Sequence, residues 1–113
     1  MQDFLMLFHT TDDPAQQPSG DELQAMLERW ENWIGGLAAQ GKFKGSEALQ
    51  PGGRMVAADG SATDGPFTEI KEMINGYAVV TAADYDEAVR LTVGCPIFEE
   101  GGRIEVRAIM YFN

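Results

Sequence analysis

The sequence runs to 113 residues, 44% hydrophobic and 23% charged, which is typical of ordinary globular proteins and predicts a single domain over residues 1–113. Eighteen acidic against eight basic residues give a net charge of −10, which argues against binding to nucleic acid or to anionic membrane surfaces. No apolar run approaches the ~20 residues that span a bilayer, and the single cysteine, Cys95, fits a reducing compartment, so we expect a cytoplasmic protein.

The first part of the chain predicts a strand, a long helix and a second strand. The wholly apolar run Phe4–Phe8 is typical of a strand that is covered on both faces. After a polar loop, Ser19 and Glu22 have the spacing of a helix capping box. Apolar residues then recur every three or four positions until Gly41, and this favours a helix with one apolar side: Leu23, Met26, Leu27, Trp30, Ile34, Leu37 and Ala38. The segment Phe43–Leu49 indicates a modest strand.

A short hairpin is predicted next. Asp59–Gly60 is a favoured two-residue turn, and extended segments flank it at Arg54–Ala58 and Ala62–Thr63. Asn75–Gly76 further along is a turn signal of the same kind, so we expect a second turn there that leads into the next strand.

The last part of the chain predicts a strand, a helix and a final strand. The run Gly76–Thr81 indicates the strand, and Asp84 with Glu87 three residues later predicts the start of the helix. Pro96 is expected to end this helix, whose apolar side would consist of Tyr85, Ala88, Val89 and Thr92. The final strand is expected over Ile104–Tyr111.

This order of elements is βαββαβ with an extra hairpin, the ferredoxin-like α+β pattern in which two helices cover one face of an antiparallel sheet. The other face would lie open to water, although Leu5, Leu7, Ile109 and Tyr111 are expected on it. An exposed apolar face of that size usually marks an interface. We therefore expect a homodimer in which the two sheets pack against each other.

Few catalytic templates fit a chain with one histidine and one cysteine. Known zinc sites need more ligands of these two kinds, and phosphate-binding glycine loops, Gly-x-Ser-x-Gly and calcium-loop patterns do not occur in the sequence. We therefore expect no metal and no cofactor. His9, at the end of the first strand, is more often a partly exposed residue without a task, and Cys95 is expected to be a small buried residue. Trp30 is expected in the core and Trp33 at the edge of a pocket or interface.

The most informative stretch is TDGPFTEIKEMINGY, at positions 63–77. Asp64 precedes a Gly-Pro pair and can accept hydrogen bonds from the amides of a turn, which explains it structurally. Phe67, Glu69 and Lys71 would share one face of an extended segment. The carboxylate of Glu69 beside the ammonium of Lys71 would form either a surface ion pair of little consequence or the polar lining of a cleft.

The same stretch resembles the signature of the YCII-related family, in particular its DGPF-domain branch. Further agreement lies at Gly45, Leu49, Pro51, Asp86–Ala88, Cys95–Pro96 and Ile104–Arg107. The resemblance implies a ferredoxin-like subunit that dimerises into an α+β barrel. Some relatives of the other branch look like lyases that eliminate chloride from aromatic compounds, with a histidine on the first helix and an aspartate in an Asp-Pro motif. The first helix of this chain has no histidine, and the motif after the second helix reads Cys95–Pro96, so that pair does not carry over.

Two hypotheses about function remain. In the first, the protein is a non-catalytic module that binds a small molecule in a cleft between sheet and helices, or meets a partner such as a transcription regulator. In the second, it is an acid–base enzyme, similar to a lyase or dehydrochlorinase, that acts on a small aromatic or carboxylate substrate with Asp64 or Glu69 as base and His9 as helper. In both, we expect a site near His9 that is lined by His9, Asp64, Phe67, Glu69 and Lys71.

Overall fold

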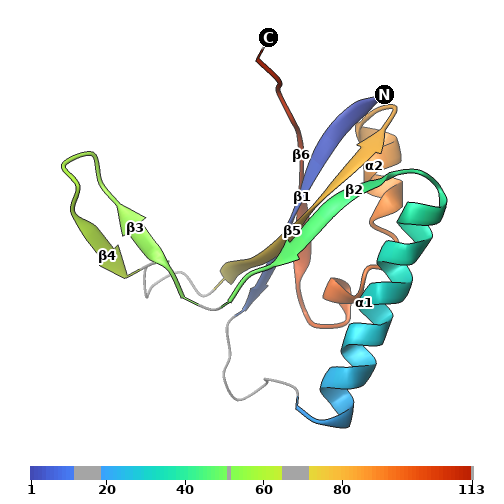
Figure 1. Cartoon of the computed structure of the whole chain (residues 1–113), viewed down its shortest axis with the longest axis horizontal. Helices are drawn as coiled ribbons and strands as arrows, with labels where there is room; N and C mark the ends of the chain where they lie inside the picture. Colours follow the sequence, from blue (N-terminus) through green and yellow to red (C-terminus); the bar gives the residue numbers. More distant parts are fainter. Residues whose placement is uncertain (12–18, 51, 65–71, 113) are drawn as a thin grey trace.

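The structure is a computed structural model that describes residues 1–11, 19–50, 52–64 and 72–112. Its elements are β1 (Gln2–Thr11), α1 (Asp21–Ala39), β2 (Phe43–Ala48), β3 (Arg54–Val56), β4 (Ala62–Asp64), β5 (Glu72–Ala82), α2 (Tyr85–Leu91), the 3₁₀ helix η2 (Pro96–Phe98) and β6 (Arg103–Ala108). Four strands form an antiparallel sheet in the order β2-β5-β1-β6, and β3 pairs with β4 in a separate hairpin. Both helices lie on one side of the sheet (Figure 1). The fold is therefore the predicted ferredoxin-like α+β fold with an extra hairpin.

Alternation along β1 divides its side chains between the two faces of the sheet, as the sequence predicts. Phe4 and Met6 are fully buried on the helix side, in a core that includes Leu37 of α1. Leu5 and Leu7 point to the opposite face, where they stay half-buried. We call the side away from the helices the open face.

The start of α1 differs from the predicted capping box. Its N-cap is Gly20, with a φ of 58°, and no side chain caps the helix, so Ser19 and Glu22 do not form the box. Glycine adopts a positive φ without strain, which suits it to this position. At α2, in contrast, the prediction is confirmed, because the Asp84 carboxylate accepts a hydrogen bond of 2.8 Å from the amide of Glu87.

Asn75–Gly76 is not a turn but part of β5, which is longer than predicted at both ends. The register between β1 and β5 shifts between Phe8 and His9, whose partners are Gly76 and Ile74. Asn75 is therefore the extra residue of a β-bulge. A bulge and a turn share a preference for Asn and Gly, which is why the sequence pattern could not separate them.

The second helix, α2, and the last strand, β6, both end earlier than predicted. α2 stops at Leu91, and Pro96 opens η2 instead of ending α2, since proline at the first position of a helix loses no hydrogen bond. The buried residues of α2 are Ala88 and Leu91, whereas Val89, predicted to be on the apolar side, is exposed. β6 stops at Ala108 and does not include Tyr111. Neither α1 nor α2 is long and apolar enough to cross a membrane.

Candidate functional site

The residues predicted to line a site are described only in part. Phe67, Glu69 and Lys71 lie outside the described residues. Asp64 is the last residue of β4, where it pairs with Arg54, but its side chain also lies outside the description. His9 is described in full. The expected meeting of these residues in one cleft therefore stays a prediction.

His9 lies on the open face and is held by a carboxylate from the neighbouring strand β6. Its Nε2 atom lies 3.0 Å from Oε1 of Glu105, whose Oε2 accepts a hydrogen bond of 3.2 Å from Arg107. These two contacts hold the pKa of Glu105 below its ordinary value of 4.5. The His9 side chain is only 20% exposed. An oriented imidazole–carboxylate pair is suited to proton transfer, because the carboxylate fixes the position of the ring.

An apolar pocket of about 290 Å³ lies on the other side of the sheet, between α1 and strands β2 and β5. Its wall is an aromatic cluster in which the ring of Phe8 lies 5.1 Å from that of Trp30 and 6.1 Å from that of Trp33, both edge to face. The apolar residues Met26, Leu27, Ile34, Ala48 and Ile97 complete the lining. We call this cavity the aromatic pocket. Because this pocket lies between α1 and the sheet, the sheet covers the apolar side of α1 only in part.

A few polar groups border the aromatic pocket. Ser46 of β2 pairs with the buried Ala78, which places its side chain on the helix side of the sheet. Asn75 donates a hydrogen bond to the hydroxyl of Thr10, and Trp30 donates one of 2.9 Å to the carboxylate of Glu100. Among the described residues that line the pocket there is no lysine, arginine or histidine. The pocket lining thus offers aromatic surface, neutral hydrogen-bonding groups and the acidic residues Glu47 and Glu100, but no positive charge.

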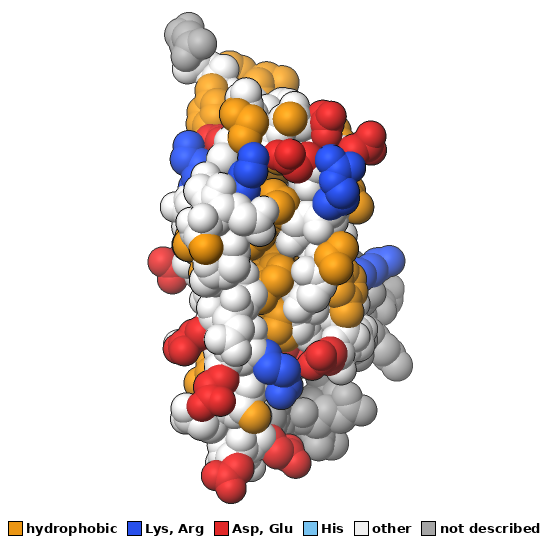
Figure 2. Space-filling view, turned by 90° about the vertical axis from the view of Figure 1, so that its right-hand side faces the viewer, with side chains coloured by type: hydrophobic (Ala, Val, Ile, Leu, Met, Phe, Trp, Pro, Cys, Tyr) orange, Lys and Arg blue, Asp and Glu red, His pale blue; other side chains and the backbone are white. Residues whose placement is uncertain are grey.

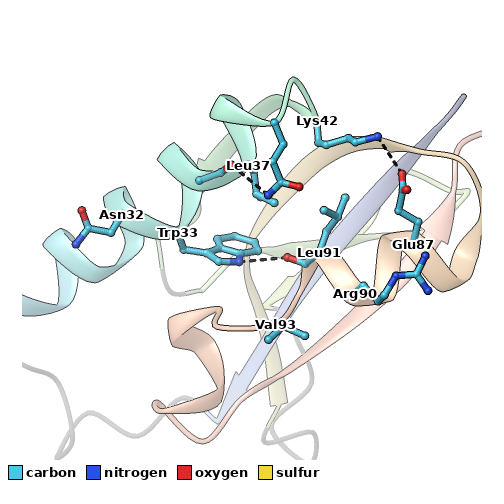
Figure 3. Close-up of a pocket in the computed structure, with 10 residues that line it drawn as sticks. Asn32, Trp33, Leu37, Lys42, Glu87, Arg90, Leu91 and Val93 are labelled. Carbon is cyan, nitrogen blue, oxygen red and sulfur yellow. Dashed lines mark hydrogen bonds and ion pairs between the residues drawn. The ribbon is translucent and has the colours of Figure 1, made fainter.

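A second hollow, the interhelical groove, has a volume of about 470 Å³ and lies between α1 and α2. Trp33, Leu37, Leu91 and Val93 supply its apolar part, and the indole N–H of Trp33 donates a hydrogen bond of 3.2 Å to the carbonyl of Leu91 (Figure 3). Figure 2 shows this side of the molecule, where hydrophobic side chains form a strip with Lys and Arg side chains above and below it. Trp33 therefore borders both hollows.

The charges at the interhelical groove are largely paired with each other. Lys42 donates a hydrogen bond of 3.0 Å to Glu87, and the amide of Ala83 donates another of 3.1 Å to the same carboxylate. These contacts hold the pKa of Glu87 below its ordinary value of 4.5. Arg90 lies beside Glu87 on α2 (Figure 3). Because Lys42 and Glu87 are already paired with each other, two of the three charged residues that line the groove are occupied, and the groove is less suited than the aromatic pocket to specific binding of a small ligand.

The predictions for Trp33 and Cys95 are confirmed. Trp33 lies at the edge of a pocket, and Cys95 is 2% exposed, where burial raises the pKa of its thiol to about 12. Trp30, predicted to be in the core, is half-buried in the wall of the aromatic pocket instead. Glu105 and Asn75 were not predicted as site residues. Their positions depend on the register of distant strands, for which the sequence has no local signal.

Comparison with known proteins agrees with the signature at positions 63–77. The family model described as the YCII-related domain matches residues 4–113. A search of the curated proteins finds no match to this chain.

Proposed function

The chain belongs to the YCII-related family, and on this premise we propose that it is a small-molecule-binding accessory protein whose ligand occupies the aromatic pocket. The observation that carries the proposal is the pocket itself, a cavity of about 290 Å³ with an aromatic wall and a few polar groups. Ligand sites in proteins are usually cavities of this composition. The proposal requires no metal and no cofactor.

The lining favours a neutral aromatic ligand over a carboxylate. A carboxylate inside the aromatic pocket would meet no described cation, and Glu100 at its border would repel it. Burying a charge without a partner is costly, whereas an aromatic ring gains edge-to-face contacts with Phe8 and Trp30. The amide of Asn75 and the hydroxyl of Ser46 can then bind one or two polar atoms of the ligand.

We further propose that the protein is a homodimer, a dimeric α+β barrel, in which two open faces pack together. Leu5, Leu7 and Val79 supply half-buried apolar surface on this face. Among the residues whose side chains the structure describes, the charged residues that register and contacts place on it are balanced, with Asp3, Glu47 and Glu105 against Lys44, Arg103 and Arg107. The whole chain, in contrast, carries a net charge of −10. Two copies therefore repel each other least when they approach through this face.

The pocket can be tested by NMR, because the chain has two tryptophans and both border the aromatic pocket. We expect 2-naphthol to shift both indole N–H signals and to bind about tenfold more tightly than 2-naphthoate, which has the same rings and a charge. Ala48→Phe, which fills the aromatic pocket, should weaken 2-naphthol binding about tenfold or more. Val93→Phe, in the interhelical groove only, is the matched control and should leave binding unchanged. Equal effects of the two variants, or no saturable binding, would contradict the proposal.

A second candidate function is that of an acid–base enzyme, and the His9–Glu105 pair favours it, provided that the pair stays accessible at the rim of the proposed dimer. In an elimination of hydrogen chloride, a base removes a proton from a hydroxyl group or from a saturated carbon, and the freed electron pair forms a double bond while chloride leaves from a saturated carbon. A chlorinated hydroxy-aromatic compound has such a carbon in its keto form. His9, oriented by Glu105 at 3.0 Å, has the geometry of such a base, whereas Asp64 and Glu69 remain predictions for this role. The test is chloride release from chlorinated hydroxy-aromatic compounds. His9→Asn should abolish it, and Glu105→Gln should lower it about 100-fold, as for loss of a positioned acid–base group.

A further inference from the structure

The β3–β4 hairpin is well formed but receives little support from the rest of its own chain. The amide of Ala57 bonds to the carbonyl of Ser61 at 2.8 Å, and the side chain of Asp59 accepts a hydrogen bond of 2.8 Å from the amide of Ser61. All described residues of the hairpin are exposed, including Met55 at 50% and Val56 at 70%. An isolated two-stranded hairpin is at best marginally stable in water. Its apolar residues therefore lack a partner within the described part of the chain.

The hairpin projects on the side of the open face. In Figure 1 the helices lie to the right of the sheet and the hairpin stands out to its left. The resulting shape is extended, with a radius of gyration of 15.7 Å and extents of 45 × 41 × 18 Å. A compact domain of this length has a radius of gyration of about 13 Å. A body that covered the open face would thus lie directly beside the hairpin.

We propose that the β3–β4 hairpin is an arm that packs against a second copy of this chain seated on the open face. The inference rests on the homodimer of the proposed function and names a part of the chain that would hold it together. In a two-fold dimer each copy gives one arm and receives one, so the contact forms twice. Met55 is suited to such a contact, since its flexible thioether side chain adapts to irregular surfaces.

The area that a dimer needs supports this role. Pairing covers 10 residues between β1 and β5, 6 between β1 and β6 and 5 between β2 and β5, so four strands about 4.8 Å apart give a flat face of roughly 450 Å². Stable interfaces bury about 800 Å² on each partner. The flat face alone is therefore too small by about half, and the arm is an exposed apolar surface on the same side that can supply part of the rest.

The arm can be tested by charged substitutions at matched exposures. Met55→Asp with Val56→Asp changes two arm residues that are 50% and 70% exposed, and Val89→Asp with Val93→Asp changes two residues on the helix side that are 53% and 76% exposed. Sedimentation over a range of concentrations should show a wild-type dimer, about 30-fold or more weakening in the arm variant, and a change of less than about twofold in the control. A wild-type dimer that both variants leave intact would overturn the arm and keep the dimer.

A wild-type monomer would overturn the arm and the proposed dimer together, but the NMR test of the aromatic pocket does not depend on the dimer.

Cross-linking gives a second measurement that does not depend on variant stability. Val56→Cys places a reactive thiol on the arm, while the native Cys95 is buried with its pKa raised to about 12. In mixed ¹⁴N and ¹⁵N protein, a benzophenone on position 56 should join the arm to β1, β5 or β6 of the other copy. Cross-links within one chain only, or to the helix side, would overturn the proposal.

Discussion

The two faces of the same sheet differ more than their shared strands would indicate. On the helix side, β1 presents Phe4 and Met6, which are fully buried within the single chain. On the open face, the same strand presents Leu5 and Leu7, which are half-buried, and His9, which is paired with Glu105. One strand therefore supplies side chains that are fully buried within the subunit on one face and side chains that remain partly exposed on the other. The difference separates residues that hold the subunit together from residues that are available for association.

The polar groups of the two faces are also arranged differently. On the open face, ion pairs run along the surface of the sheet, with Lys44 bonded to Asp3 at 2.9 Å and Arg107 to Glu105 at 3.2 Å. On the helix side, the described chain has no buried side-chain nitrogen or oxygen without a hydrogen-bond partner. Charges that are already paired within a face can be covered at lower cost than free charges. The open face is thus polar and yet compatible with burial in an interface.

The largest effect should come from a direct comparison of the faces within β1. Phe4→Ala removes a fully buried ring, and we expect the free energy of unfolding to fall by about 3–5 kcal/mol. Leu5→Ala, one residue away on the open face, should cost less than about 1.5 kcal/mol in the monomer, because the side chain is already half-exposed. Urea unfolding at low protein concentration measures both. Equal losses would show that the open face is part of the subunit core.

The next effect concerns Gly102, where η2 approaches β1. A Cβ atom there would lie 2.5 Å from the carbonyl oxygen of His9 and 2.6 Å from the side chain of Ile97. Backbone cannot yield at such a contact, so Gly102→Ala should destabilise the subunit by about 1–3 kcal/mol, as overpacking does. The measurement is the same urea titration. An unchanged midpoint would mean that η2 can move away from the sheet without cost.

A smaller effect of opposite sign is expected at Gly36. This glycine lies inside α1 at the interhelical groove, and a Cβ atom there would meet no atom within 4 Å. Gly36→Ala should therefore stabilise the protein by about 0.5–1 kcal/mol, since alanine has less freedom to lose on folding. Gly41→Ala is the control, because its φ of 71° strains any side chain even though its space is open. A loss of stability in Gly36→Ala would mean that another molecule contacts the helix there.

The smallest effect is the dependence of stability on pH. It allows a comparison of the Glu105 ion pair on the open face with the Glu87 ion pair on the helix side. The pKa of Glu105 is lowered by His9 and then by Arg107, and that of Glu87 by Lys42 and then by the amide of Ala83, both from an ordinary value of 4.5. A group with a lowered folded-state pKa contributes its full stabilisation above its unfolded-state pKa, and this contribution is lost as the pH falls from there through the folded-state pKa. Thermal midpoints between pH 7 and pH 3 should therefore decrease. Glu105→Gln and Glu87→Gln should each flatten this decrease, and a curve identical to that of the wild type would contradict the assignment.

Features with a strong local pattern could be predicted from the sequence. The alternation of β1, the length of α1 and the cap at Asp84 all depend on neighbouring residues, and together they fix the ferredoxin-like order. The features that could not be predicted depend on residues far apart in the sequence. Glu105 meets His9 only through the register of β1 with β6, and Asn75 borders the aromatic pocket only because the register of β5 shifts there. The sequence predicts Trp33 at the edge of a pocket, which is confirmed, but it places Trp30 in the core and so could not show that both rings line one cavity.

The position of β1 in the sheet has a consequence for how the protein folds during its synthesis. This strand is synthesised before its two neighbours, β5 and β6, and Phe4 pairs with Ala108, which lies far away in the sequence. Such contacts between distant residues slow folding, because a long loop must close before they form. While β6 is still inside the ribosome, one edge of an apolar strand stays unpaired. The sheet therefore cannot form strand by strand in the order of synthesis, and the hydrophobic strand β1 has to be kept from other chains until β6 emerges.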